Sequence, residues 1–158
     1  RIMALVDQDS AQVRFPPPLI VLGMLLLGLA AEPAFGLPRI DVAALRPIGL
    51  VVGGLGAAIL ASGLFGFFRA GNDPEPWKKD TALVTSGLYR FSRNPMYLGM
   101  VLVQLGIALF AQSIGGLVSV PLAILLIDRF VIAREEPHLV ATFGEEYRAY
   151  CARVRRWI

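Results

Sequence analysis

The fold is decided by a stretch that begins RNPMYLG at residues 93–99 and ends REE at residues 134–136. The 34 residues from 94 to 127 carry no charged side chain. A membrane-spanning helix needs about 20 apolar residues, so this run is too long for one crossing and suits two short ones joined by a hairpin. A polar, flexible turn is predicted near its middle, at residues 112–116. The hairpin would bring the polar clusters at its two ends to the same face of a membrane.

The rest of the chain has the same apolar character. Of its 158 residues, 56% are hydrophobic and 17% charged, against roughly 45–50% and about 25% in soluble domains. Residues 47–68 form a second uncharged run of 22 residues, which as a helix would be about 33 Å long. We therefore predict an all-α integral membrane protein with about four transmembrane helices and a C-terminal amphipathic helix in the cytoplasm. The expected helices run over residues 17–36, 47–69, 95–111, 116–134 and 138–153.

A chain of this length is expected to form a single membrane domain over residues 1–158. We divide it into a polar arm (1–14), two spans (17–69), a cytoplasmic loop (70–93) and a hairpin with the C-terminal helix (94–158). Four crossings place most of the Lys and Arg residues on the side of the two termini and the loop. Because positive charge favours the cytoplasmic side, both termini and the 70–93 loop are expected in the cytoplasm, with the protein in a bacterial inner membrane.

Three local patterns carry structural expectations. The second span is rich in glycine, which predicts a face for close helix packing. Asn94 and Pro95 predict a helix start, with the Asn94 side chain as the cap and Pro95 in the first turn. Arg155, Arg156 and Trp157 are interpreted as an interfacial anchor.

The polar clusters at the hairpin ends are candidates for a binding site. The helix that starts at Pro95 presents unpaired N–H groups, which suit a carboxylate or phosphate. Glu135 and Glu136 suit a cation, an amine or ribose hydroxyls, although such a pair is also typical of a solvated helix exit. Tyr89 and Tyr97 suit a flat ring or a cationic centre, or belong to an aromatic belt.

Metal and nucleic-acid sites are not expected. The chain has one cysteine and one histidine, which argues against a metal site, so no metal is predicted. The basic residues gather by side of the membrane and form no nucleic-acid stripe. The expected partners are membrane lipids, and the oligomeric state stays open.

The two clusters also form an ordered motif pair. Gly87-x-Tyr89-x-x-x-Arg93-Asn94-Pro95-x-Tyr97-x-Gly99 is followed by Arg134-Glu135-Glu136, by FGEEY at 143–147 and by VRRW at 154–157. Over residues 80–158 this pair resembles the isoprenylcysteine carboxyl methyltransferase family and the related phospholipid methyltransferases. The resemblance implies methyl transfer from S-adenosylmethionine to a lipophilic acceptor, small or lipidated, that enters from the bilayer. It also implies a cytoplasm-facing cofactor pocket closed by the C-terminal helix.

Carried over by motif position, the resemblance implies roles for individual residues. Arg134, Glu135 and Arg93 would be catalytic. Cofactor contacts are implied for Asn94, Pro95, Tyr97, Leu98, Gly99 and Glu136, to which we add Tyr89 and His138. Asn94 stands where many relatives have histidine. Arg134 or Arg93 would orient a carboxylate acceptor, whereas an amine acceptor would need His138 or a glutamate as base.

Two other functions fit the sequence. One is an NADPH-dependent membrane reductase of the steroid-reductase-like type, and the other is a non-enzymatic small membrane protein. Methyl transfer from a sulfonium needs alignment and exclusion of water more than a strong base. The sequence therefore favours the methyltransferase and leaves the acceptor open.

Overall fold

The computed structural model describes residues 16–72 and 82–158. Within these ranges every regular element is a helix, so the all-α prediction is confirmed. The elements are α1 (Pro17–Phe35), α2 (Leu45–Arg69), the short 3₁₀ helix η2 (Gly87–Arg90), α3 (Pro95–Phe110), α4 (Ile114–Ile127), the π-helical turn η3 (Asp128–Ile132) and α5 (Ala133–Arg153). The predicted polar arm and the 73–81 part of the predicted loop lie outside the described residues.

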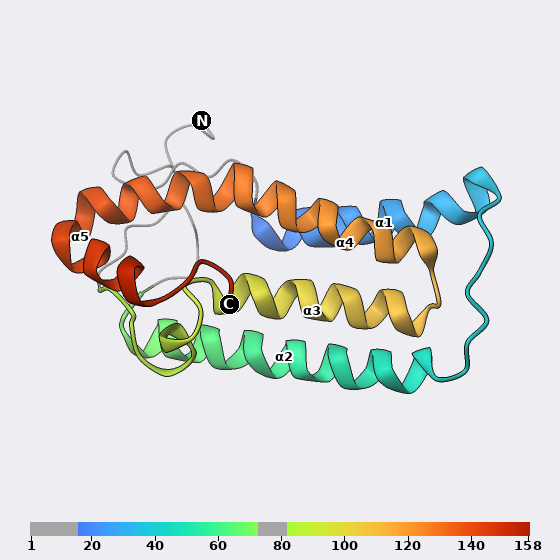
Figure 1. Cartoon of the computed structure of the whole chain (residues 1–158), viewed down its shortest axis with the longest axis horizontal. Coiled ribbons are helices and arrows are strands. Elements are labelled where there is room, and N and C mark those ends of the chain that lie inside the picture. Colours follow the sequence, from blue (N-terminus) through green and yellow to red (C-terminus); the bar gives the residue numbers. More distant parts are fainter. Residues whose placement is uncertain (1–15, 73–81) are drawn as a thin grey trace, which may run out of the picture.

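The membrane helices form a bundle of α1, α2, α3 and α4. Helices α1 and α2, and the continuous helix from Ile114 onward, are long and apolar enough to cross a membrane. Helix α3 is apolar but has 16 residues, about 24 Å, which is shorter than a full hydrocarbon core. It lies between α2 and α4 (Figure 1), so the short helix is covered on two sides by longer ones.

Glycines set the spacing of the bundle. A Cβ atom on Gly106 of α3 would lie 2.4 Å from the backbone nitrogen of Gly53 on α2. The same holds between α1 and α4, where a Cβ on Gly28 would lie 2.4 Å from the carbonyl oxygen of Gly115. These backbones are too close for any larger residue. The predicted packing face of the second span is therefore confirmed, and its partner is α3 of the same chain.

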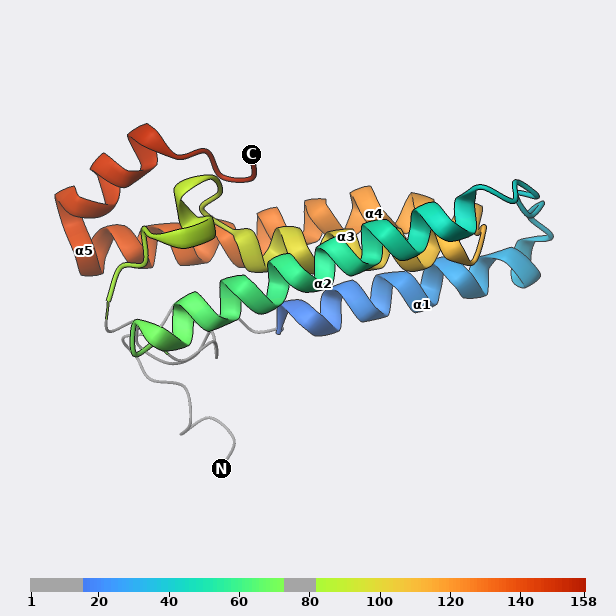
Figure 2. The ribbon, with the colours of Figure 1, turned by 90° about the horizontal axis from the view of Figure 1, so that it is seen from below.

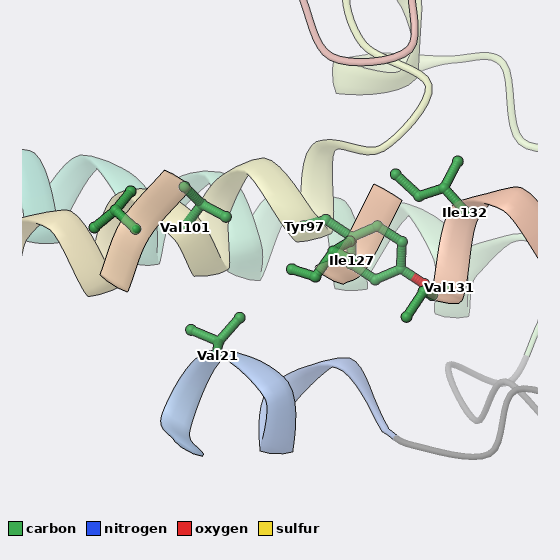
Figure 3. Close-up of a cluster of buried hydrophobic side chains, with 7 residues drawn as sticks. Val21, Tyr97, Val101, Ile127, Val131 and Ile132 are labelled. Carbon is green, nitrogen blue, oxygen red and sulfur yellow. The ribbon is translucent and has the colours of Figure 1, made fainter. Parts of the chain in front are cut away.

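The buried core runs along α1, α3 and α4 toward one end of the bundle. Val21, Val101 and Ile127 pack with Val131 and Ile132 of the π-turn, and Tyr97 lies among them (Figure 3). The π-turn η3 belongs to this core, and the helical backbone continues through it from α4 into α5. Tyr97 is thus packed at the point where the bundle meets the elements beyond it.

Those elements form an end cap, which we define as η2, η3, α5 and residues 154–158. Helix α5 extends past the bundle, reverses, and brings the C terminus back beside the start of α3 (Figures 1 and 2). The reversal lies at Gly144, whose φ of 55° and ψ of −124° are not helical. The predicted break near residues 134–138 is therefore wrong, since the chain turns where a glycine permits that backbone.

The amphipathic pattern of the C-terminal helix has a different geometry from the one expected. Leu139 and Phe143 lie before Gly144, whereas Tyr147, Tyr150 and Val154 lie after it, yet all five belong to one apolar cluster. Their spacing of four and three residues is the basis of the predicted amphipathic helix, and these residues do pack together. They pack across a reversal of the chain, and not along one face of a straight helix.

Candidate active site

The two ends of the hairpin meet in the end cap. The Tyr97 hydroxyl at the start of α3 donates a hydrogen bond of 2.6 Å to Glu135 Oε1 on the first turn of α5. Arg93 Nη1 lies 3.2 Å from Glu136 Oε1. Both carboxylates are partly buried and hold partners, so the solvated helix exit is the wrong alternative. Such charge-assisted contacts fix geometry more firmly than neutral ones.

The C-terminal tail, residues 154–158, makes a third set of contacts in the site. Arg156 donates to Glu136 through Nε at 3.0 Å and through Nη2 at 2.5 Å. Its Nη1 reaches both carboxylate oxygens of Asp128, at 3.0 and 3.2 Å. The hydrogen bonds to Glu136, and then those to Asp128, raise the pKa of Arg156. Arg156 is therefore part of the candidate site, a role that its interpretation as an interfacial anchor did not include.

Trp157 also faces inward, since it packs against the core cluster of the bundle. Trp157 and the backbone of Arg155 thus attach the tail to the rest of the protein. Their position follows from the reversal at Gly144, which aims the last residues back at α3.

Asn94 starts α3 but does not cap it with its side chain. Its Nδ2 donates to the carbonyl oxygen of Arg156 at 2.9 Å, and the Arg93 backbone N–H donates to the carbonyl oxygen of Arg155 at 3.0 Å. The predicted side-chain cap is wrong because the returning tail takes the Asn94 amide. Pro95 occupies the first turn as expected and is buried.

Tyrosines lock the end cap to the bundle. Tyr89 is buried, and its carbonyl oxygen accepts a 2.7 Å hydrogen bond from the Tyr150 hydroxyl. Its own hydroxyl points to the carbonyl oxygen of Gly63 on α2, at 3.5 Å. Tyr97 is buried as well. The aromatic-belt alternative is therefore wrong for both.

The other predicted site residues lie in different environments. Gly99 faces α2, where its Cβ would lie 2.6 Å from the backbone nitrogen of Leu60, so it sets helix spacing. Leu98 and His138 are partly buried, whereas Arg134 is exposed on the first turn of α5. The structure thus groups Arg93, Tyr97, Glu135 and Glu136 closely and leaves Gly99 on the opposite face of α3.

Four residues of the site were not among the sequence predictions. Arg93 Nη1 donates to Cys151 Sγ at 2.6 Å, and Asp128, Tyr150 and Arg156 make the contacts described above. One feature of the sequence marks Asp128 as a possible site residue: it is the first charged residue after a long apolar run. The other three lie after Gly144, and nothing local in the sequence fixes where that segment packs.

Two buried polar atoms of this region lack a hydrogen-bond partner, Arg93 Nε and His138 Nε2. Buried polar groups are nearly always paired. Both residues are predicted site residues, and Glu135, the neighbour of the Glu136 that pairs with Arg93, adds negative charge. The donor and acceptor set suits a polar ligand with a cationic centre.

The family comparison covers this region. The family model for phospholipid methyltransferases matches residues 48–146, which is more than half of the chain and includes Arg93, Tyr97, Glu135 and Glu136. The chain belongs to the phospholipid methyltransferase family. This membership points to a methyltransferase and favours methyl transfer over the reductase and the non-enzymatic alternative.

Two relatives match shorter parts of this family member. An uncharacterized protein of Haemophilus influenzae is 43% identical over 63 residues, which are 40% of this chain and all of that protein. The protein-S-isoprenylcysteine O-methyltransferase of Schizosaccharomyces pombe is 37% identical over 79 residues, 48% of this chain. The match covers 32% of the yeast enzyme, so the matched part of the chain corresponds to about a third of that protein. The resemblance to the isoprenylcysteine methyltransferases is thereby supported.

Proposed function

We propose that this protein transfers a methyl group from S-adenosylmethionine to a lipophilic acceptor at the cytoplasmic face of a bacterial inner membrane. The acceptor would be a prenylcysteine-like carboxylate or a lipid. The observation that carries the proposal is the pairing of Tyr97 with Glu135 and of Arg93 with Glu136. It joins the two motifs of the family at one end of the bundle.

The residues present fit a sulfonium donor. When bound, such a donor supplies an electrophilic methyl group on a positively charged sulfur. The Glu135 carboxylate favours a cation over its neutral product, whereas the charge of Glu136 is balanced by Arg93 and Arg156. The unpartnered Arg93 Nε and His138 Nε2 offer hydrogen-bonding positions for polar groups. The burial of Tyr97 keeps bulk water from one side of the site.

The acceptor would reach the site along α4. Leu122, Leu125 and Phe130 are exposed on α4 and η3, the helix that leads to Arg134. Such a surface suits a lipid chain. Arg134, exposed at the end of this path, would neutralise and orient a carboxylate. For an amine acceptor, His138 Nε2 would hold the released proton.

Donor binding is the first test. Calorimetry in lipid nanodiscs should show saturable binding of S-adenosylmethionine to the wild type. Glu135→Gln should weaken it about tenfold or more, because a charge-assisted contact worth about 1.5–3 kcal/mol is lost. Tyr97→Phe should weaken it less, since the carboxylate stays. Glu146→Gln, an exposed glutamate of the same helix, is the matched control.

Absence of binding by the wild type would overturn the proposed donor. Equal losses in Glu135→Gln and Glu146→Gln would overturn the proposed site, because a general charge effect would then explain both. Normal binding by Glu135→Gln would do the same.

Acceptor class is tested by the chemistry of the product. Membranes containing the protein are incubated with methyl-labelled donor, and the labelled lipophilic product is treated with alkali. A methyl ester releases its label as volatile methanol, whereas an N-methyl group keeps it. Release would identify a carboxylate acceptor, and retention would identify an acceptor of another kind, such as an amine, a thiol or a phenol. Label incorporation equal to that of membranes without the protein would contradict methyl transfer.

A further inference from the structure

Arg156 links two acidic side chains of the end cap. Its guanidinium bonds two acidic side chains that lie two helical turns apart on the helix running from η3 into α5. Asp128 opens the π-turn, and Glu136 lies on the first turn of α5. The family match ends at residue 146, so this contact comes from a segment beyond it.

The contact is shared with Arg93. Glu136 Oε1 lies 3.2 Å from Arg93 Nη1 and 3.0 Å from Arg156 Nε. Two guanidinium groups and two carboxylates thus form one network with no net charge. Its members are partly buried, with Arg93 15% and Glu136 21% exposed. In such a setting each charge depends on its partners, so loss of one changes the orientation of the others.

The tail does not depend on this side chain for its attachment. Backbone contacts tie it to the segment before α3, through the carbonyl oxygens of Arg155 and Arg156. Trp157 adds an apolar contact with the core. Removing the Arg156 guanidinium therefore leaves the tail in place and changes mainly Glu136 and Asp128.

We propose that Arg156 is a positioning residue for the donor end of the site: its guanidinium fixes the Glu136 carboxylate against Arg93 without touching the reacting atoms. The inference rests on the proposed function. It differs from a purely structural role because it acts through Glu136. A structural role would lower the stability of the whole end cap, whereas a positioning role changes donor affinity.

The test is a double-mutant cycle on donor binding. Arg156→Gln should weaken S-adenosylmethionine about tenfold, and Glu136→Gln should weaken it at least as much. The double variant should bind as weakly as Glu136→Gln alone, because Arg156 acts through that carboxylate. Arg153 is an exposed arginine at the end of α5. The Arg153→Gln variant should bind the donor as the wild type does.

Three further readouts separate positioning from folding. Arg156→Lys keeps the charge but loses the forked geometry, so it should recover only part of the affinity. In steady-state assays Arg156→Gln should raise the donor KM about tenfold and change kcat by less than about threefold, as expected for a lost binding contribution. Its melting temperature in detergent should match that of Arg153→Gln.

Three results would overturn the inference while leaving the proposed function intact. The first is a wild type that binds donor together with an Arg156→Gln variant that binds it equally well. The second is additive losses in the double variant. The third is a loss of affinity that follows a matching fall in melting temperature. If the wild type itself fails to bind donor, the proposed function fails and this inference with it.

Discussion

The bundle and the end cap are held together in different ways. In the bundle, α2 and α3 touch through backbone atoms, because glycines remove the side chains between them. In the end cap, segments distant in sequence are joined by charged and hydroxyl side chains, as in the contacts of Arg156 with Asp128 and Glu136. The first region belongs to the apolar part of the chain and the second to its polar end.

This difference separates stability from function. Apolar helices in lipid gain little from the hydrophobic effect between themselves, so close packing must hold the bundle. Charged groups are costly in the hydrocarbon region and gather where they are used. We expect changes in the bundle to alter folding first, and changes in the end cap to alter ligand binding first.

The largest effect is expected from Gly106→Ala. The new methyl group would meet the backbone of Gly53, and overpacking of this kind costs about 3 kcal/mol. The melting temperature in detergent should fall strongly, and donor binding should be lost with the fold. Gly54→Ala is the matched control, because nothing lies within 4 Å of its added Cβ. Equal stability of the two variants would contradict packing by glycine contact.

Gly144→Ala should have a smaller effect, confined to the end cap. Its added Cβ would meet no atom within 4 Å, so the cost comes from the backbone conformation alone, about 1–3 kcal/mol. Donor affinity should fall because the tail returns less often to α3. Helix content and protection of the bundle from protease should stay at the wild-type level. Loss of the bundle together with the affinity would contradict this separation of the two regions.

The smallest effect is expected from Gln104→Met. Gln104 is buried within the bundle and donates to Ser119 Oγ at 2.9 Å. Hydrogen bonds between membrane helices contribute about 0.6 kcal/mol on average, and methionine has a similar volume. Thermal unfolding should therefore shift only slightly, with donor affinity unchanged. A loss as large as that of Gly106→Ala would show that polar contacts hold the bundle.

Much of the bundle was predictable because its signals are local. Uncharged runs gave the helices, Pro17 and Pro95 marked two helix starts, and the glycines of the second span marked a packing face. Helix α3, with 16 residues, differs from α1, α2 and the continuous helix from Ile114 in being shorter. Each of these features can be deduced from neighbouring residues.

The end cap was predictable only in part. The motif pair correctly indicated that the start of α3 would meet Glu135 and Glu136, since a hairpin joins them. The contacts of Arg156, Tyr150 and Cys151 depend on the reversal at Gly144. A glycine inside a helical pattern does not reveal which direction the chain takes next. Asn94 shows the same limit, because its local signal as a cap was overridden by a distant carbonyl group.

The central claim is that residues 93–99 and 134–136 together hold a methyl donor. The most direct test is an experimentally determined density map of the protein in lipid with S-adenosylhomocysteine, the demethylated product. We predict density for the nucleoside between these two segments, within contact distance of Tyr97 and Glu135. Density for the ligand elsewhere on the protein, with these segments paired only to each other, would contradict the claim.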